Sequence, residues 1–460
     1  MRKYLVIGVS SFVLGAGAMA YLSPMAQAAL QPKAKTYRML ELFGDVVDTV
    51  ERQYVAPVDD TKLIESALDG MLSSLDPHSG YLSPDGFEDM QDNTRGEYGG
   101  IGLEVTSEEG VVKVISPMDG TPAERAGVQP GDYITAVNGS SVLGLSTNDV
   151  VKQLRGEPGS AVGLTLAREK SDPVEVKLTR EVIKPRTVTA RVEGDYGYVR
   201  LASFNEKATD EVEAAVKDLK AKNPNMKGLV FDLRNNPGGL VDQSVGVADL
   251  FLEGGEVVSQ RGRDPRDIER YNARPGDILN GLPMVVLINQ GSASASEIVA
   301  GALKDRKRAE IVGLTSFGKG SVQTVIPLRG GQDGALKLTT ARYYTPSGRS
   351  IQQTGIDPDL EVAQTREQAQ SIANQAWFSE ASFKNALNAE EGKTRRGVHE
   401  PAEAPPPAFD EKKGDFQLSR ALEVLKHGSV AATPKLPKPA AKVADLVAKS
   451  VKPEPKPATK

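Results

Sequence analysis

Apolar residues recur at helical spacing early in the chain. Between residues 37 and 92 they return every three or four positions, as at Leu40 and Phe43. This spacing places them on one face of a helix, so we predict a helical module over residues 33–95. The module includes a turn with the sequence LDPHSGY, in which His78 is expected to make local hydrogen bonds.

The pattern then changes to short strands separated by glycine-containing turns. Residues 111–115 and 164–168 have the composition of strands, with an amphipathic helix over residues 147–154 between them. Farther on, strands alternate with helices, which is typical of a layered α/β core. We therefore predict a small β-rich domain over residues 96–184 and a larger core domain over residues 185–385.

The two ends of the chain differ in composition from the rest. Residues 1–28 combine a basic start, an uncharged stretch and the exit Ala26-Gln27-Ala28, which predict a signal peptide or, if it is not cleaved, a membrane anchor. We therefore expect export to the periplasm, with or without attachment to the inner membrane. Toward the other end, a C-terminal helical segment is predicted over residues 386–430. The residues 431–460 are rich in Pro, Ala and Lys and are predicted to be disordered.

The composition limits the chemistry that is available. The 460 residues include no Cys and only three His, and the formal net charge is −5. Without cysteine there can be no disulfide, thiolate metal site or cysteine nucleophile, and the chain has no H-E-x-x-H motif. We therefore expect no metal and no cofactor. The lack of a basic surplus gives no reason to expect a nucleic-acid partner.

One motif of the β-rich region resembles the signature of PDZ domains. It is PAERAGVQPGDYITAVNG, and the preceding run YGGIGLEV resembles the carboxylate-binding loop of those domains. Glycines allow successive backbone N–H groups to converge on a terminal carboxylate, and an adjoining strand edge can pair with an extended peptide. The predicted peptide-binding residues are Gly100, Ile101, Gly102 and Leu103, with Ile101 and Leu103 lining the pocket for the last side chain. A plain connecting turn is the alternative.

Two strand–turn–helix units of the core domain carry residues suited to catalysis. One strand, over residues 228–233, leads into the turn RNNPGGL, and another, over residues 284–288, leads into NQGSASASEI. Open α/β sheets place their sites at the carboxyl ends of strands, so we expect the two turns to face each other. Ser294 in the second turn starts a helix whose free N–H groups favour negative charge. Glu297 is expected to be a first-turn carboxylate that favours the helix dipole.

A serine nucleophile needs a base to take its proton. The three histidines fall in the helical module or the C-terminal part of the chain, so Lys319 is the best candidate. It must be neutral, and burial beside Phe317 between glycines would lower its pKa. Gln323 lies four residues on in an alternating pattern and would share a face with Lys319. A helix-capping serine and a surface hairpin are the alternatives to catalysis.

These runs and the PDZ signature together resemble the carboxyl-terminal processing peptidases, also called tail-specific proteases. The likeness covers nearly all of the chain except the leader and the tail. It implies a multidomain α+β protein with a catalytic α/β core like that of crotonases and Clp proteases, an inserted PDZ domain and the N-terminal helical module. It also implies that Ser294 is the nucleophile, Lys319 the general base and Gln323 the residue that orients the lysine.

The same resemblance implies two further sets of functional residues. The oxyanion hole would combine the backbone N–H of Ala295 with that of Gly238 or Gly239, and the sequence does not decide between the two glycines. Arg155 stands where the family has a regulatory arginine that couples occupancy of the PDZ domain to the active state. An arginine after a helix is, however, usually a solvated cap.

The predicted function is that of an exported serine endopeptidase, which recognises substrate C-termini through its PDZ domain and cleaves polypeptides with a Ser-Lys dyad. Its expected partners are polypeptides with accessible apolar C-termini, an adaptor protein, and further copies of the chain in a homodimer or higher oligomer. Two alternatives stay open. One is a catalytically silent PDZ scaffold of the cell envelope, and the other is an enzyme that rests inactive until an adaptor binds.

Overall fold

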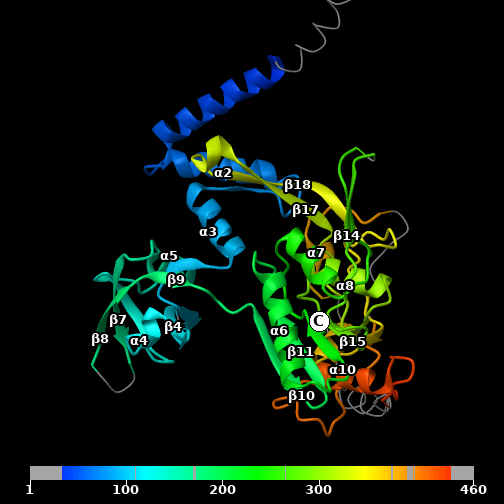
Figure 1. Cartoon of the computed structure of the whole chain (residues 1–460). Coiled ribbons are helices and arrows are strands. Elements are labelled where there is room, and N and C mark those ends of the chain that lie inside the picture. The colour runs from blue at the N-terminus through cyan, green and yellow to red at the C-terminus, as the bar shows by residue number, and fades with distance from the viewer. Residues whose placement is uncertain are drawn as a thin grey trace, which may run out of the picture. The chain divides into compact units, whose positions relative to one another are not determined.

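The computed structural model describes residues 34–108, 110–168, 172–264, 266–374, 377–390, 397 and 399–436. The predicted leader and most of the predicted tail lie outside these residues. The chain divides into two compact units, residues 1–73 and 74–460. The described part of the first unit consists of a helix over residues 34–53 and α2 (Asp60–Ser73) (Figure 1). Among the described residues, no helix is both long and apolar enough to cross a membrane.

The second unit opens with β1 (Gly80–Leu82) and α3 (Pro84–Arg95). Helix α3 begins where the Ser83 hydroxyl accepts a hydrogen bond from the backbone N–H of Gly86 at 3.2 Å, and it ends at Gly96, whose φ is 71°. The helical pattern predicted between residues 37 and 92 corresponds to the helix over residues 34–53, α2 and α3. The strand β1 was not predicted, because three residues are too few to show an alternating pattern.

The β-rich region has a core of its own. Its elements are β2 (Tyr98–Gly100), β3 (Leu103–Glu108), β4 (Val111–Pro117), α4 (Pro122–Arg125), β5 (Tyr133–Val137), β6 (Ser140–Ser141), α5 (Thr147–Leu154), β7 (Ala161–Ala167), β8 (Val174–Thr179) and β9 (Glu181–Ile183). The main sheet has the order β3-β4-β5-β7-β8. Strands β2 and β9 pair antiparallel, with Gly100 opposite Glu181, so the chain enters and leaves this region at one place.

A mixed six-stranded sheet forms the centre of the core domain. Its strands, in spatial order, are β10 (Val188–Glu193), β11 (Tyr196–Leu201), β12 (Leu229–Asp232), β15 (Met284–Ile288), β16 (Glu310–Gly313) and β19 (Leu360–Glu361). All neighbouring pairs from β11 to β19 are parallel, while β10 is antiparallel to β11. The helices between these strands are α6 (Ala208–Lys222), α7 (Val241–Asp249) and α8 (Ala295–Asp305). The predicted alternation of strands and helices is confirmed.

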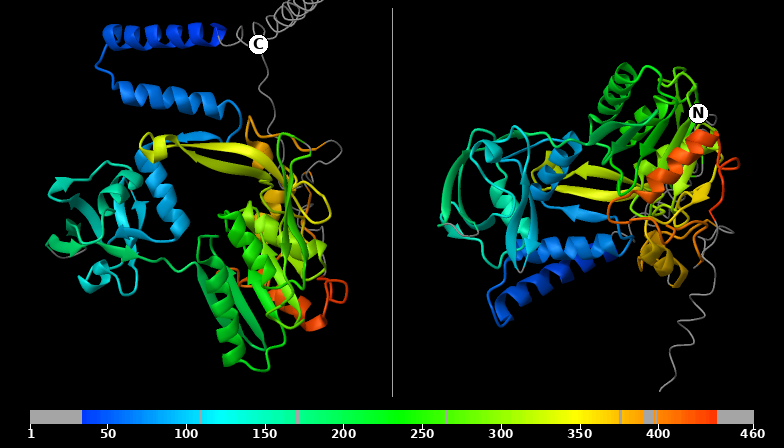
Figure 2. Two further views of the ribbon diagram at one scale, coloured as in Figure 1. Left: turned by 45° about the horizontal axis from the view of Figure 1, so that its top comes forward. Right: turned by 90° about the horizontal axis from the view of Figure 1, so that it is seen from below.

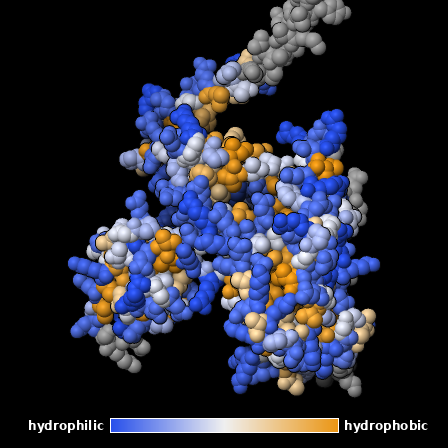
Figure 3. Space-filling view, viewed as in Figure 1, coloured by the Kyte–Doolittle hydropathy of each residue, from blue (hydrophilic) through white to orange (hydrophobic). Residues whose placement is uncertain are grey.

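Apolar side chains cover both faces of this sheet. Phe231 packs in the large cluster that includes α6, α7 and α8, while its neighbour Val230 packs in a second cluster with α10 (Phe416–His427). Successive strand residues point to opposite faces, which explains the division. Because many apolar residues are buried in these clusters, the face of the protein drawn in Figure 3 is mostly hydrophilic.

A second sheet is built around the long strand β18 (Ala335–Tyr344). Strand β17 (Ser321–Pro327) pairs along one edge of β18, while β1 and β13 (Gly255–Arg261) pair with the other edge. Strand β14 (Ile268–Ala273) continues from β13. Figure 2 shows the long β17–β18 hairpin in yellow. This sheet brings residues from near position 80 next to residues beyond position 320.

The C-terminal helices close the core domain. Helix α9 (Arg366–Asn374) is followed about 40 residues later in the chain by α10, whose N-cap residue is Asp415. The buried guanidinium of Arg234 donates to Asp232 and to Asp415, each at 2.6 Å, and so fixes α10 to the end of β12. Residues 431–436, which composition assigned to the disordered tail, instead pack here, since Arg420 donates to the carbonyl of Pro434 at 2.9 Å.

Candidate active site

The two predicted turns lie side by side at one edge of the six-stranded sheet. Strands β12 and β15 are parallel neighbours, with Asp232 opposite Leu287, so their carboxyl ends meet. The N–H of Ala293 donates to the carbonyl of Asn236 at 3.0 Å, and the Ser296 hydroxyl donates to the same carbonyl at 2.9 Å. The prediction that these turns face each other is confirmed.

Ser294 has a strained backbone conformation at the start of α8. Its φ of 55° and ψ of −112° lie where residues with a Cβ are rarely found. Such strain persists only where the surroundings enforce it, and it clusters at functional sites. Gly238 permits a close approach, because a Cβ at that position would lie 2.9 Å from the Ser294 Cβ and 3.1 Å from the backbone nitrogen of Ala295.

Ser294, Lys319 and Gln323 line one cavity of about 790 Å³. Gly238 and Gly239 line it too, so the structure brings these predicted residues together, and Ala295 is fully buried beside Ser294. The apolar part of the wall includes Phe204, Leu240, Val241, Val325 and Tyr343. A mostly apolar wall with a few polar groups is typical of substrate pockets. Within the described residues, no group of three or more His, Cys, Asp or Glu is placed to hold a metal ion.

Glu297 has a larger role than the sequence suggested. It is completely buried, and burial raises its pKa while its hydrogen bonds oppose that effect. Its carboxylate accepts hydrogen bonds from the N–H of Ser294 at 2.8 Å, the Ser316 hydroxyl at 2.5 Å, and the N–H groups of Gly318 at 2.7 Å and Lys319 at 2.9 Å. One side chain therefore fixes both the serine turn and the lysine loop. The only signal in the sequence was its position three residues after Ser294, the spacing of a capping box.

The surroundings of Lys319 favour its neutral form. Burial lowers the pKa of Lys319, and the positive charge of Lys337 on β18 lowers it further. The carboxylates of Glu380, Glu297 and Asp76 act in the opposite direction. The net result is a pKa below the ordinary value of lysine, which is the direction that a general base requires.

The hydrogen bonds of the predicted dyad are not formed in this conformation. Within the residues that the structure describes, none joins Ser294 to Lys319. The side-chain amide of Gln323 donates instead to the hydroxyls of Ser321 at 2.9 Å and Thr339 at 3.2 Å. The argument that strand alternation places Gln323 and Lys319 on one face does not hold. Lys319 precedes β17, and the register of that strand shifts just before Gln323.

Replacing Lys337 by Gln is expected to move the acid limb of the pH–rate profile to higher pH. The substitution removes a positive charge that disfavours the Lys319 ammonium, so the pKa of Lys319 rises and less neutral amine is present at a given pH. On the acid limb the rate should fall roughly three- to tenfold. The measurement is kcat/KM as a function of pH, with Lys337→Arg as the charge-preserving control. An unmoved limb in Lys337→Gln would contradict this account.

The backbone N–H groups near Ser294 distinguish the two candidate oxyanion glycines. The N–H of Gly238 already donates to Asn236 Oδ1 at 2.9 Å. In the described part of the chain, no hydrogen bond engages the N–H of Gly239 or that of Ala295. These two N–H groups are therefore available to a negatively charged oxygen.

The predicted carboxylate loop connects β2 to β3. Gly102 has a φ of 75°, and a Cβ there would lie 2.4 Å from the side chain of Thr121, so the position requires glycine. Ile101 is only 2% exposed and packs in the core of the β-rich region. The expectation that Ile101 lines an open pocket is therefore wrong. The loop is tied to α4 by a hydrogen bond from the N–H of Ala123 to the Ile101 carbonyl at 3.0 Å, which turns the loop inward.

The edge of β3 matches the geometry expected for peptide binding. Gly100 is the last residue of β2, and Leu103 is half-buried at the start of β3. Strand β3 is the outermost strand of its sheet and pairs with β4 on one side. Helix α5 contacts β3. A free strand edge beside a helix is the kind of groove in which an extended peptide adds a strand.

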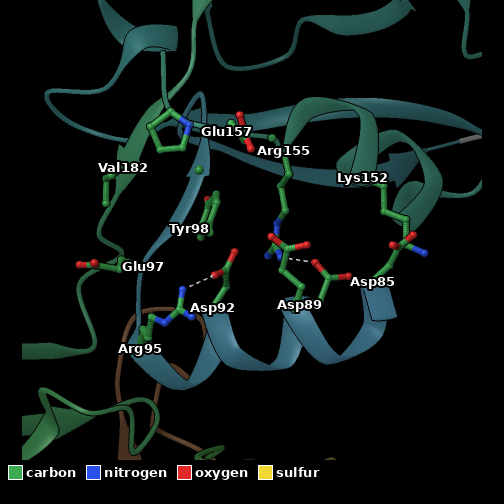
Figure 4. A pocket seen from close by; sticks show the side chains of 14 residues that line it. Asp85, Asp89, Asp92, Arg95, Glu97, Tyr98, Lys152, Arg155, Glu157 and Val182 are labelled. Carbon is green, nitrogen blue, oxygen red and sulfur yellow. Dashed lines mark hydrogen bonds and ion pairs between the residues drawn. The ribbon is translucent and has the colours of Figure 1, made fainter. Parts of the chain in front are cut away.

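Arg155 lies in a different pocket, of about 540 Å³, which residues of α3 and α5 line (Figure 4). Its Nη1 donates to Asp89 at 3.1 Å, and its guanidinium lies 4.5 Å from the centre of the Tyr98 ring. Arg155 is therefore the C-cap residue of α5, but its side chain is partly buried and paired rather than solvated. The structure places it apart from the cavity of Ser294, although Glu97 and Tyr98 border both pockets.

Comparisons with known proteins show to which families and relatives the chain is similar. Peptidase family S41 matches residues 195–362, the PDZ domain matches residues 113–168, and the N-terminal domain of the activating protease CtpB matches residues 14–86. A carboxy-terminal-processing protease from Bartonella bacilliformis is 52% identical over 357 residues, which cover 77% of this chain and 82% of that protein. A probable CtpA-like serine protease from Staphylococcus aureus is 37% identical over 336 residues, covering 72% of this chain and 66% of that protein. Among solved structures, a photosystem II D1 C-terminal processing protease is 35% identical, with 70% of this chain and 92% of that chain covered and a TM-score of 0.42.

Proposed function

The chain belongs to the carboxy-terminal-processing proteases of peptidase family S41 and is a serine-type peptidase, and from this premise we propose that Ser294 and Lys319 form its catalytic dyad. The observation that supports the proposal most is that the two residues line one cavity. Ser294 has a strained backbone at a helix N-terminus, and burial lowers the pKa of Lys319. The catalytically silent scaffold is disfavoured by membership of this peptidase family.

In the proposed mechanism, the neutral amine of Lys319 takes the proton of the Ser294 hydroxyl as Oγ attacks the scissile carbonyl carbon. The carbonyl oxygen becomes an oxyanion, which the free N–H groups of Ala295 and Gly239 stabilise. The Lys319 ammonium then gives the proton to the leaving amine as the C–N bond breaks. Water, deprotonated by the same amine, releases the acyl group as a new C-terminus and restores Ser294.

We further propose that the PDZ domain selects the substrate. Its glycine loop would hold the terminal carboxylate of a polypeptide with an apolar C-terminus, and the free edge of β3 would pair with the preceding residues. Export to the periplasm is proposed from the composition of residues 1–28. An adaptor protein and an oligomer of this chain belong to the same proposal.

The core sheet supports a finer assignment of the fold. Its strands from β11 to β19 are parallel, and the catalytic turns follow the neighbouring strands β12 and β15. We propose that this core has the architecture of crotonases and Clp proteases. The support is topological, because the proposed oxyanion glycine and nucleophile lie on neighbouring turns of the sheet.

A tailed model substrate tests the function directly. The purified protein is expected to cleave an unstructured polypeptide with a free apolar C-terminus, and to cleave the C-terminally amidated version about tenfold more slowly, since the amide cannot bind the carboxylate loop. The Ser294→Ala protein should bind the free tail without cleaving it. Equal cleavage of both substrates would remove the proposed role of the PDZ domain, and cleavage by Ser294→Ala would remove the proposed nucleophile.

A second candidate state is an enzyme that rests inactive until a partner or tail binds. The observation that favours it is that, among the described residues, no hydrogen bond joins Ser294 to Lys319, although both line one cavity. Binding of a tail would then favour a conformation in which the dyad is aligned. A tail peptide added in trans should raise the rate of cleavage of an untailed substrate if this state exists.

A further inference from the structure

The turn between α2 and β1 contains two buried polar residues that the mechanism above does not use. Asp76 is 4% exposed and Ser79 is 5% exposed. Asp76 Oδ1 accepts hydrogen bonds from the N–H groups of His78 and Ser79, each at 2.9 Å, and Oδ2 accepts from the Ser79 hydroxyl at 2.6 Å. A buried carboxylate with this many donors fixes the turn in one conformation.

One chain of hydrogen bonds runs from this turn to Gln323. The Thr339 hydroxyl donates to Asp76 Oδ1 at 3.0 Å and accepts from the Gln323 amide at 3.2 Å. The N–H of Thr339 donates to the Ser79 hydroxyl at 3.1 Å. Asp76 therefore positions the Gln323 side chain through a single intervening hydroxyl.

A second chain runs from the same turn to the loop that carries Lys319. His78 Nε2 lies 2.8 Å from Glu380 Oε2, so the ring pairs with a residue 302 positions away, in addition to the expected local hydrogen bond, which the His78 N–H makes to Asp76. Glu380 Oε1 accepts from the Gln352 amide at 2.9 Å, and Gln352 Oε1 accepts from the N–H of Gly320 at 2.9 Å. Glu380 and Gln352 are both fully buried.

Glu380 also holds the other flank of that loop. Its backbone N–H donates to the Phe317 carbonyl at 3.2 Å. Gly318 and Gly320 on either side of Lys319 bring little stiffness of their own, and a Cβ at Gly320 would lie 2.4 Å from the backbone nitrogen of Gln352. The loop is therefore held from two directions, by Glu297 of α8 and by Glu380 with Gln352.

We propose that the turn Asp76–Ser79 positions both the catalytic base and its glutamine, with His78 acting through Glu380 and Gln352 on the Lys319 loop and Asp76 acting through Thr339 on Gln323. The inference rests on the proposed Ser-Lys function. A displacement of about 1 Å between reacting groups can cost roughly 100-fold in rate. Such remote contacts can therefore control kcat without touching substrate.

Three groups surround His78, and one of them, Glu380, also affects the pKa of Lys319. Glu380 faces its ring from the segment Glu380–Ser382, Phe383 lies against the ring with centroids 5.8 Å apart, and the Asp76 carboxylate holds its backbone. The charge of Glu380 raises the pKa of Lys319 against the effect of burial. Glu380→Gln keeps the shape of the side chain but removes this charge, so the pKa of Lys319 should fall and the acid limb should move to lower pH.

The kinetic test compares His78→Ala with His78→Gln, whose amide nitrogen can occupy the place of ring Nε2. His78→Ala is expected to lower kcat roughly 10- to 100-fold with KM changed less than about twofold, and His78→Gln should recover most of the loss. In Glu380→Gln, the acid limb of the pH–rate profile should move to lower pH. His427→Ala, which removes a histidine on the last turn of α10, is the matched control and should behave as wild type.

Amide hydrogen exchange tests the positioning without relying on catalysis. Residues 317–320 should exchange about tenfold faster in His78→Ala, while β12 and β15 keep their protection. Unchanged exchange and unchanged kcat in His78→Ala, beside an inactive Lys319→Ala, would overturn the inference and leave the dyad standing. Wild-type activity in Lys319→Ala would instead show that the proposed function fails, and the exchange result would still decide whether the turn holds the loop.

Discussion

Lys319→Ala is expected to reduce kcat by about 10³-fold or more while leaving the melting temperature close to that of the wild type. Without the amine the proposed base is gone, and the carboxylates that also line the cavity, Asp92 and Glu97, are paired with Arg95 and Lys207. Lys319→Arg should be as inactive, because a guanidinium stays protonated and cannot act as a base. Single-turnover cleavage of a tailed peptide measures the effect.

The controls for this prediction separate chemistry from folding. Lys217→Ala removes an exposed lysine that pairs with Glu213 on α6 and should cleave at the wild-type rate. In the wild type, the rate should climb with pH through the lowered pKa of Lys319 and then level off. A Lys319→Ala protein with more than about a tenth of wild-type kcat would require another base.

Glu297→Ala should be the most damaging substitution for the structure of the site. It would remove the acceptor of four donors, of which those of Ser316 and Gly318 are buried and those of Ser294 and Lys319 are partly buried. Each unpaired buried donor costs about 1–3 kcal/mol, so the free energy of unfolding should fall by about 4 kcal/mol or more. The rate should fall at least about 100-fold, because the serine turn and the lysine loop lose their common support.

Chemical denaturation with parallel kinetics measures both effects. Glu297→Gln keeps one acceptor oxygen but places an amide against backbone donors, so it should lie between Glu297→Ala and the wild type. Glu213→Ala on the exposed face of α6 is the matched control, with an expected change below about 0.5 kcal/mol. Wild-type stability in Glu297→Ala would show that these donors find other partners.

The sequence was sufficient for the parts of the site that depend on local patterns. Apolar runs predicted β12 and β15, and the turns after them contain the glycines and Ser294, so neighbouring parallel strands were enough to bring Gly238 and Ser294 together. The PDZ signature likewise predicted a β-rich insertion with its own core. Each of these inferences rests on residues close together in the chain.

Contacts between distant segments could not be predicted in the same way. Glu297 reaches the N–H of Lys319 across 22 positions, and His78 reaches Glu380 across 302. Both depend on tertiary packing of segments far apart in the chain, which no periodicity records. Ile101 was wrongly predicted to line a pocket. An apolar residue in a glycine loop can point toward a ligand or into the core, and the hydrogen bond between this loop and α4, which turns Ile101 into the core, cannot be seen in the sequence.

The link from Arg234 to Asp415 has a consequence for protein synthesis. A ribosome completes β12 and its glycine turn about 180 residues before it reaches the helix that neutralises Arg234. Until then, one face of the central sheet lacks its cover, and a buried cation has only Asp232 beside it. A truncated nascent chain therefore cannot complete its peptidase domain. Translation order thereby delays completion of the peptidase domain until α10 has been made.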